Sequence, residues 1–238
     1  MIEELVPLVR RKFGDNLVAL AATASYARNE DADYSDLELT AFVKSMPEGS
    51  RWGGIGKIRD GLLVELIWTT GEIYLEDTRE VTANWYLAGS DTLQPVINEE
   101  FIAELNAYRV PNLKQKCLVQ AAKRWHEVQE ATSKVLNAVA AGNREALTLL
   151  APDMLRQMLI ALSFLNQTPY VTFAKYIAQA RAFELKPADL EGLIGLVSGC
   201  AYQDLRALEE GIVKVFTQFE ALYEGLGVEL YDEDIDPN

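Results

Sequence analysis

The sequence predicts an α+β fold, with a mixed β-sheet and flanking helices in residues 1–112 and a helical bundle in residues 113–238. In the first part, short apolar segments bounded by turn residues alternate with helical patterns. After Pro111, apolar residues recur at helical spacing over long segments with short connections, as in a bundle. The chain has 238 residues, 49% of them apolar, so each part can bury a core.

The expected elements of the first part follow from their apolar patterns. Helical spacing opens the chain, short apolar runs mark strands such as residues 17–23 and 62–69, and residues 36–43 alternate before they turn apolar. Pro47-Glu48-Gly49 and Gly53-Gly54 are expected to form turns. In order, the elements are helix 2–13, strand 17–23, short helix 25–30, strand 36–43, strand 62–69, helix 81–87 and strand 94–97.

The second part is expected to be entirely helical. An apolar stripe that includes Ala121, Trp125 and Val128 predicts one long helix. Pro152 is expected to begin a helix, because proline suits the first helical turn. The expected helices are 113–141, 145–150, 152–165, 171–183, 188–197 and 204–225.

Charge and composition exclude several classes of protein. A net charge of −14 without a basic cluster argues against nucleic acid as a partner and would suit a cationic substrate. We find no signal-peptide pattern and no apolar run long enough to span a bilayer, so a cytoplasmic protein without a membrane partner is expected. A single histidine, His126, excludes a His-rich metal site and disfavours a histidine-based triad. Cys117 and Cys200 are expected to be buried, reduced thiols.

Three carboxylates in the strand segments could bind a metal ion. Asp36 and Glu38 are two residues apart on an expected strand, so both project from one face and repel each other. Glu65 lies in an apolar strand, where a buried charge is costly unless it is paired or bound to metal. Oxygen ligands of this kind indicate Mg²⁺. The alternatives are a solvated sheet face for the pair and an outward position on an edge strand for Glu65.

A turn that could bind phosphate precedes these carboxylates. Ser25 follows an apolar strand and opens a short expected helix, whose first N–H groups would favour an anion. Arg28 lies one turn later and could reach the same anion. A phosphate turn followed by metal-binding carboxylates suits nucleotidyl transfer, in which phosphates must be positioned and neutralised.

The stretch from Ala21 to Leu39 resembles the signature of the nucleotidyltransferase superfamily, in which glycine and serine precede an acidic pair. Within it, the chain is most similar to the kanamycin (aminoglycoside) nucleotidyltransferases, and the similarity extends over nearly the whole chain. The segments that carry it are Phe13-Gly14-Asp15-Asn16, Tyr34-Ser35-Asp36-Leu37-Glu38 and Val64-Glu65-Leu66.

The resemblance implies transfer of AMP from ATP, with Mg²⁺, to a hydroxyl of a small molecule. An aminoglycoside-like acceptor is implied, and with it a role in antibiotic resistance. Ser25 and Arg28 would contact phosphates, and Asp36, Glu38 and Glu65 would hold the metal. The resemblance also implies a homodimer whose active site is shared between two subunits.

The helical part supplies a further similarity. Glu130-Ala131-Thr132-Ser133-Lys134 resembles the family's Glu-x-x-x-Lys segment, which implies that Glu130 is the general base and Lys134 a phosphate ligand. On a helical wheel, Glu127, Glu130 and Lys134 lie roughly opposite the stripe of Trp125, so they face away from the bundle core. The alternative is an ordinary surface pair at i,i+4 spacing.

Two positions depart from the family pattern. Ala24 stands where the family has glycine before the serine, and Ala27 replaces a residue that is often glycine. The carboxylates are intact, which favours an active enzyme. An antitoxin-like or regulatory nucleotide-binding protein and a catalytically silent homologue remain alternatives, as does an acceptor other than an aminoglycoside. Asp91, Glu99 and Glu100 are further acidic candidates, for which ordinary surface exposure is expected.

Overall fold

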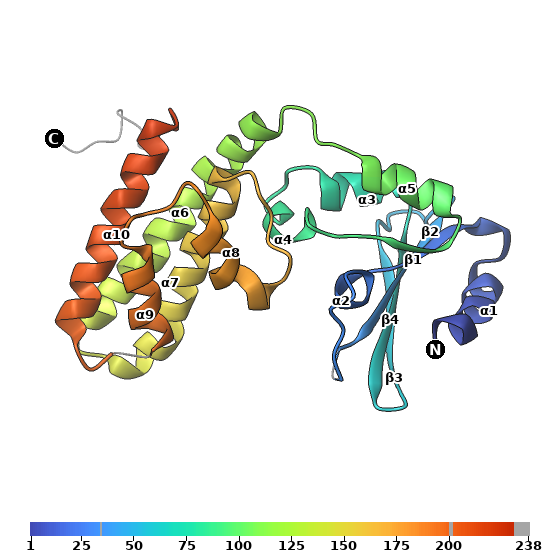
Figure 1. The fold of residues 1–238 in the computed structure, drawn as a ribbon, viewed down its shortest axis with the longest axis horizontal. Helices are drawn as coiled ribbons and strands as arrows, with labels where there is room; N and C mark the ends of the chain where they lie inside the picture. The colour runs from blue at the N-terminus through green and yellow to red at the C-terminus, as the bar shows by residue number, and fades with distance from the viewer. Residues whose placement is uncertain (34, 200–201, 231–238) are drawn as a thin grey trace. The chain divides into compact units, whose positions relative to one another are not determined.

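The computed structural model describes residues 1–33, 35–199 and 202–230, and the chain divides into two compact units (Figure 1). We call Met1–Pro111 the N-terminal unit and Asn112–Asn238 the C-terminal unit, and describe each by itself. Tyr34, part of the family-like motif, and Cys200, expected to be a buried thiol, lie outside the described residues.

A five-stranded sheet forms the centre of the N-terminal unit (Figure 1). The strand order is β3-β4-β2-β1-β5; β2 and β4 pair in parallel, and the other neighbours pair antiparallel. The mixed sheet and the α+β class are therefore confirmed. The strands are β1 Leu17–Ala22, β2 Leu37–Val43, β3 Gly53–Arg59, β4 Leu62–Thr69 and β5 Gln94–Ile97.

Helices cover both faces of this sheet. On one face, Val9 of α1 packs against Leu20 and Leu39. On the other face, Tyr74 and Ile102 pack with Phe42. The ring centroids of Phe42 and Tyr74 are 5.3 Å apart. The helices are α1 Ile2–Phe13, α2 Ala24–Ala27, α3 Gly71–Tyr74, α4 Trp85–Ala88 and α5 Glu99–Ala107, with a 3₁₀ turn Gly14–Asn16 and a π turn Leu75–Arg79.

Two expectations for the N-terminal unit were wrong. Gly53-Gly54 does not form a turn but begins β3, which the sequence did not predict. A Cβ at Gly53 would lie 2.1 Å from Cε2 of Trp68, so glycine is required there for close approach of the strands. The helix expected at 81–87 forms only at Trp85–Ala88, and the helices Gly71–Tyr74 and Glu99–Ala107 were not predicted.

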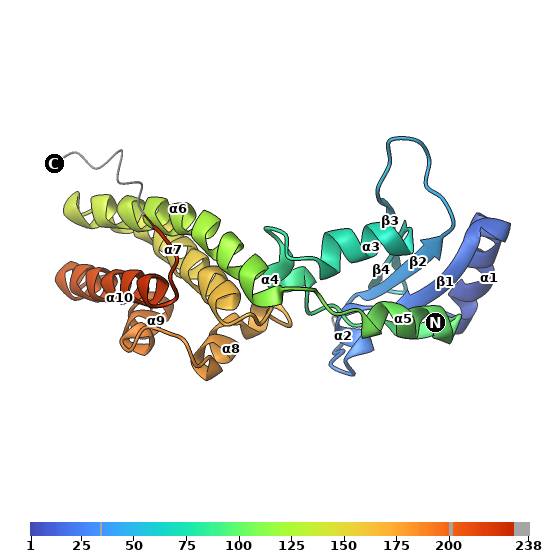
Figure 2. The same cartoon turned by 90° about the horizontal axis from the view of Figure 1, so that it is seen from above.

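The C-terminal unit is a helical bundle, as expected, in which α6, α7 and α10 lie side by side (Figure 2). Trp125 of α6 stacks on Phe216 of α10 with ring centroids 4.8 Å apart. The hydroxyl of Tyr223 donates a hydrogen bond of 3.0 Å to the carbonyl oxygen of Ala121. The elements are α6 Leu113–Ala140, α7 Arg144–Leu165, a 3₁₀ turn Phe173–Lys175, α8 Tyr176–Ala182, α9 Leu190–Ser198 and α10 Leu205–Gly225.

Helix α7 differs from the sequence prediction in two ways. It is one helix with Pro152 inside it, rather than two helices that meet at this proline. Its 22 residues are also long and apolar enough to cross a membrane by length and composition, which the sequence reading had not anticipated. Because 67% of its most apolar window is buried inside the structure, the core helix of a bundle accounts for this composition.

Candidate metal and nucleotide site

Parallel pairing of β2 with β4 brings the three predicted carboxylates together. Glu38 lies directly opposite Glu65 in this register, and Asp36 directly precedes β2. One carboxylate oxygen from each residue lies within 4.8 Å of the others. In the described part of the chain, this is the one group of three or more His, Cys, Asp or Glu with such spacing.

Strand alternation places this carboxylate cluster (Asp36, Glu38 and Glu65) opposite α1. Leu39 and Leu66, the neighbours of the two strand glutamates, belong to the core beneath α1, so Glu38 and Glu65 project from the other face. Strand β4 lies between β3 and β2, which excludes the alternative of an edge-strand position for Glu65. Glu65 instead faces Gly56 of β3, where an added Cβ would lie 3.6 Å from its Oε1.

The pKa of Glu38 shows that the carboxylates of the cluster repel one another. Burial raises the pKa of Glu38, and the charges of Asp36, Glu65 and Asp91 raise this pKa further. A hydrogen bond from the buried hydroxyl of Thr23 acts in the opposite direction. Half-buried carboxylate oxygens at this spacing fit a hard divalent cation, which would relieve the repulsion.

Asp91 is a fourth carboxylate near the cluster, and it is not the ordinary surface residue that we expected. It accepts a hydrogen bond of 2.9 Å from the hydroxyl of the buried Tyr74. Burial raises the pKa of Asp91, while this hydrogen bond and the charges of Arg79 and Arg28 lower it. No local pattern marks this residue, because its partner Tyr74 is 17 positions away in the chain.

Helix α2, which follows β1, begins with a residue in an unusual backbone conformation. Ala24 has a φ of 54°, the left-handed region that glycine adopts without strain. Ser25 follows it and is half-buried; its carbonyl oxygen accepts hydrogen bonds from the backbone N–H groups of Arg28 and Glu30, at 3.2 and 2.9 Å. Ala24 therefore holds a left-handed backbone conformation that is strained for a residue with a Cβ.

Arg28 is held beside this turn. Its Nε lies 3.0 Å from Oε2 of Glu30, and only 18% of its side chain is exposed. The positive charge of Arg28 lowers the pKa of Asp91, which places the guanidinium within electrostatic range of that carboxylate. A phosphate bound at the turn would therefore compete with Glu30 for Arg28.

Glu130 and Lys134 belong to the C-terminal unit, so they come from a different compact unit than the carboxylate cluster. Lys134 Nζ lies 2.7 Å from Glu130 Oε1, and 56% and 49% of these side chains are exposed. Both face away from the buried Trp125, as the helical wheel predicts. Lys134 lowers the pKa of Glu130, so the pair is charged at neutral pH.

Among the described residues, neither Cys117 nor His126 lies in a catalytic arrangement. Cys117 is a buried, free thiol, as expected, and burial raises its pKa to about 12. It is therefore protonated at neutral pH and is a poor nucleophile. His126 is exposed on α6.

Comparisons with known proteins agree with this geometry. Residues 114–229 match the family model of the KNTase C-terminal domain. A solved structure, a nucleotidyltransferase-like protein from Exiguobacterium sibiricum, superposes with a TM-score of 0.50 at 13% identity, over 94% of this chain and 75% of that chain. At this identity the likeness shows the fold alone, and that fold is the nucleotidyltransferase fold.

A curated relative adds a short similarity in sequence. A protein of Methanocaldococcus jannaschii named "Putative protein adenylyltransferase" is 33% identical over 48 residues, which are 20% of this chain. The match spans only a third of that relative's length. The family-model match and this short similarity support the nucleotidyltransferase superfamily, and the solved structure agrees with it in fold.

Proposed function

We propose that this protein transfers AMP from ATP, with Mg²⁺, to a hydroxyl of a small molecule. The observation that carries the proposal is the carboxylate cluster, in which the register of two parallel strands sets Glu38 against Glu65 beside Asp36. Such a cluster is costly to hold together without a cation. A bound divalent ion would supply charge neutralisation for the triphosphate and the leaving pyrophosphate.

The chain's own residues have distinct roles in this proposal. Asp36, Glu38 and Glu65 hold the metal, and the turn at Ser25 positions the phosphates with Arg28. Glu130, by the family resemblance, accepts the proton of the acceptor hydroxyl, as a general base within reach of the reacting group must.

We make two further proposals that involve the Glu130–Lys134 pair. Lys134 contacts a phosphate, and the protein is a cytoplasmic homodimer in which the Glu130–Lys134 pair serves the site of its own or the other subunit. The exposure of both side chains supports this, because a partner subunit or a substrate can reach them.

An aminoglycoside-like acceptor is the proposed substrate, as in antibiotic resistance. The net charge of −14 favours a polycationic molecule. Asp91 adds an acidic group near the cluster that could pair with an ammonium group of such an acceptor.

A screen with labelled ATP tests the proposal. Aminoglycosides and uncharged polyols are incubated with the protein and Mg²⁺, and AMP transfer and pyrophosphate release are measured. We expect label on an acceptor with the wild type and none with Asp36→Asn, which should remain folded by circular dichroism. Equal turnover in Asp36→Asn would reject the assignment.

A second candidate is transfer of AMP to a protein hydroxyl, and the similarity to the M. jannaschii protein favours it. The same labelled ATP distinguishes the two candidates. Label that stays with protein after denaturation, while no small acceptor is labelled, would favour the protein acceptor. A stable protein partner and no ATP turnover would favour an antitoxin-like or regulatory role.

A further inference from the structure

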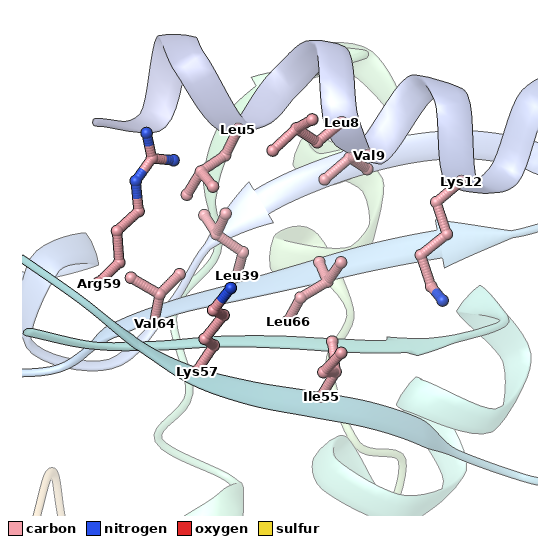
Figure 3. Close-up of a pocket in the computed structure, with 10 residues that line it drawn as sticks. All are labelled: Leu5, Leu8, Val9, Lys12, Leu39, Ile55, Lys57, Arg59, Val64 and Leu66. Atoms are coloured by element: carbon pink, nitrogen blue, oxygen red, sulfur yellow. The ribbon is translucent and has the colours of Figure 1, made fainter.

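A pocket of about 520 Å³ lies between α1 and the sheet, on the face opposite the carboxylate cluster (Figure 3). This volume is in the range of small-molecule sites. Its apolar residues come from one helix and three strands. They are Leu5, Leu8 and Val9 of α1, Leu39 of β2, Ile55 of β3, and Val64 and Leu66 of β4.

Every charged side chain that lines this pocket is a cation. Lys57 and Arg59 reach from β3 toward α1, and Lys12 extends from α1 toward the strands (Figure 3). Three cations around one apolar floor stand out in a chain whose net charge is −14. The local charge of the pocket therefore opposes the charge of the protein as a whole.

These cations can exchange their present contacts for an anionic ligand at a small cost in free energy. Arg59 Nη2 pairs with Glu4 Oε2 at 2.8 Å, but 64% of the Glu4 side chain is exposed, and such surface pairs contribute little. Lys12 Nζ lies 4.5 Å from the centre of the Trp68 ring. Among the described residues, Lys57 forms no ion pair.

The apolar rim of the pocket is open to solvent. Leu8 is 47% exposed and Ile55 is 58% exposed. Packing of α1 on the sheet therefore does not cover these side chains. An apolar ligand body would remove this surface from water, which favours binding in proportion to the apolar area covered.

We propose that this pocket binds a small anionic amphiphile, with its apolar chain or ring against α1 and the strands and its carboxylate or phosphate beside Lys12, Lys57 and Arg59. The apolar lining of the pocket suits the apolar part of such a ligand, and the three cations suit its anionic head group. No residue of the carboxylate cluster lines the pocket, so the site is separate from the proposed transfer site.

Titration calorimetry with three ten-carbon probes tests the proposal: decanoate, decanol and decyltrimethylammonium, each below its micelle concentration. We expect saturable binding of decanoate at one site, and weaker binding of the neutral and cationic probes. Because the readout is heat of binding and not AMP transfer, failure here and failure of the proposed function are distinguishable.

Two variants on the exposed strand β3 locate the site. Lys57→Glu replaces attraction by repulsion and should weaken decanoate binding about tenfold or more. Ile55→Ser should also weaken it. Ile58→Ser is the matched control: Ile58 is 64% exposed on the same strand but does not line the pocket, so binding should not change.

Three results would overturn the proposal. These are the absence of saturable binding of decanoate, equal binding of all three probes, and equal weakening by Ile55→Ser and Ile58→Ser. Sedimentation tests a second copy of the chain as the occupant. A self-association that Ile55→Ser abolishes, with no decanoate binding, would assign the pocket to a subunit interface instead.

Discussion

The carboxylate cluster and the Glu130–Lys134 pair both contain glutamates that the sequence marks as candidate site residues. They differ in how the negative charge of those glutamates is balanced. In the cluster, burial and then the charges of Asp36 and Glu65 raise the pKa of Glu38, and no cation among the described residues forms an ion pair with Glu38. On α6, Lys134 lies 2.7 Å from Glu130 and lowers its pKa. The cluster has a charge that a bound cation would balance, whereas Lys134 already balances the charge of Glu130.

Because of this difference, the proposed roles of the cluster and of the Glu130–Lys134 pair have different support. The cluster is a candidate metal site by its own geometry, because a divalent cation would relieve the repulsion among its carboxylates. The pair has the geometry of a common surface contact worth a few tenths of a kcal/mol, so its catalytic role depends on the family resemblance. The predictions below test that contrast.

The largest expected effect is loss of AMP transfer when the cluster changes. Glu38→Gln keeps the shape of the side chain but removes a metal ligand, and should lower kcat by about a thousandfold or more. Steady-state pyrophosphate release measures this. Glu72→Gln, on the exposed side of α3, is the control and should turn over like the wild type.

The next effect concerns Glu130. If it is the general base, Glu130→Gln lowers kcat by about a hundredfold or more with little change in the Tm. Glu127→Gln, on the same exposed face of α6, is the matched control. Equal and small losses in both variants would leave Glu130–Lys134 as a surface pair.

Metal should stabilise the protein only through an intact cluster. Mg²⁺ at a hundred times its Kd should stabilise the folded wild type by about 2.7 kcal/mol. Thermal melts with Mg²⁺ and with EDTA measure the shift. A similar Mg²⁺-dependent rise in the Tm of Asp36→Asn would show that the ion binds elsewhere.

Without metal, the contribution of Glu38 to stability should fall as the pH rises. The pKa of Glu38 is raised above its ordinary 4.5 in the folded protein, so the folded state holds this proton more tightly than the unfolded chain. That contribution is present below pH 4.5 and is lost as the pH rises through the folded pKa. Glu38→Gln in EDTA should therefore have a higher Tm than the wild type at pH 7, and a lower one would contradict the account.

The smallest effect is at the turn before Ser25. Ala24 has a φ of 54°, so Ala24→Gly should stabilise the protein by about 1 kcal/mol, measured by urea denaturation. Ala27→Gly, at the other end of the same short helix α2, is the contrast and should destabilise the protein. A loss of stability in Ala24→Gly would mean that the backbone strain is absent.

The sequence predicted elements with strong periodicity and missed those without it. The helix at Ile2–Phe13 and the strand at Leu62–Thr69 follow from their apolar spacing and were predicted to the residue. Strand β3 was missed because Gly53-Gly54 is typical of a turn, and only the Trp68 ring against it explains the glycine.

The candidate site was predictable in its residues and not in its arrangement. Asp36, Glu38 and Glu65 were identified from strand position, but their approach depends on the parallel pairing of β2 with β4, which no local pattern encodes. Asp91 was expected to be an ordinary surface residue, but Tyr74, which is distant in the sequence, binds it by a hydrogen bond near the cluster. The strain at Ala24 is a property of the folded turn.

The most direct measurement is a calorimetric titration of Mn²⁺, as a stand-in for Mg²⁺, into the protein with a non-hydrolysable ATP analogue. The account predicts saturable binding to the wild type that is lost in Asp36→Asn and strongly weakened in Glu65→Gln, while Glu130→Gln binds as the wild type does. Binding that survives in both cluster variants would contradict the central claim that Asp36, Glu38 and Glu65 hold the metal.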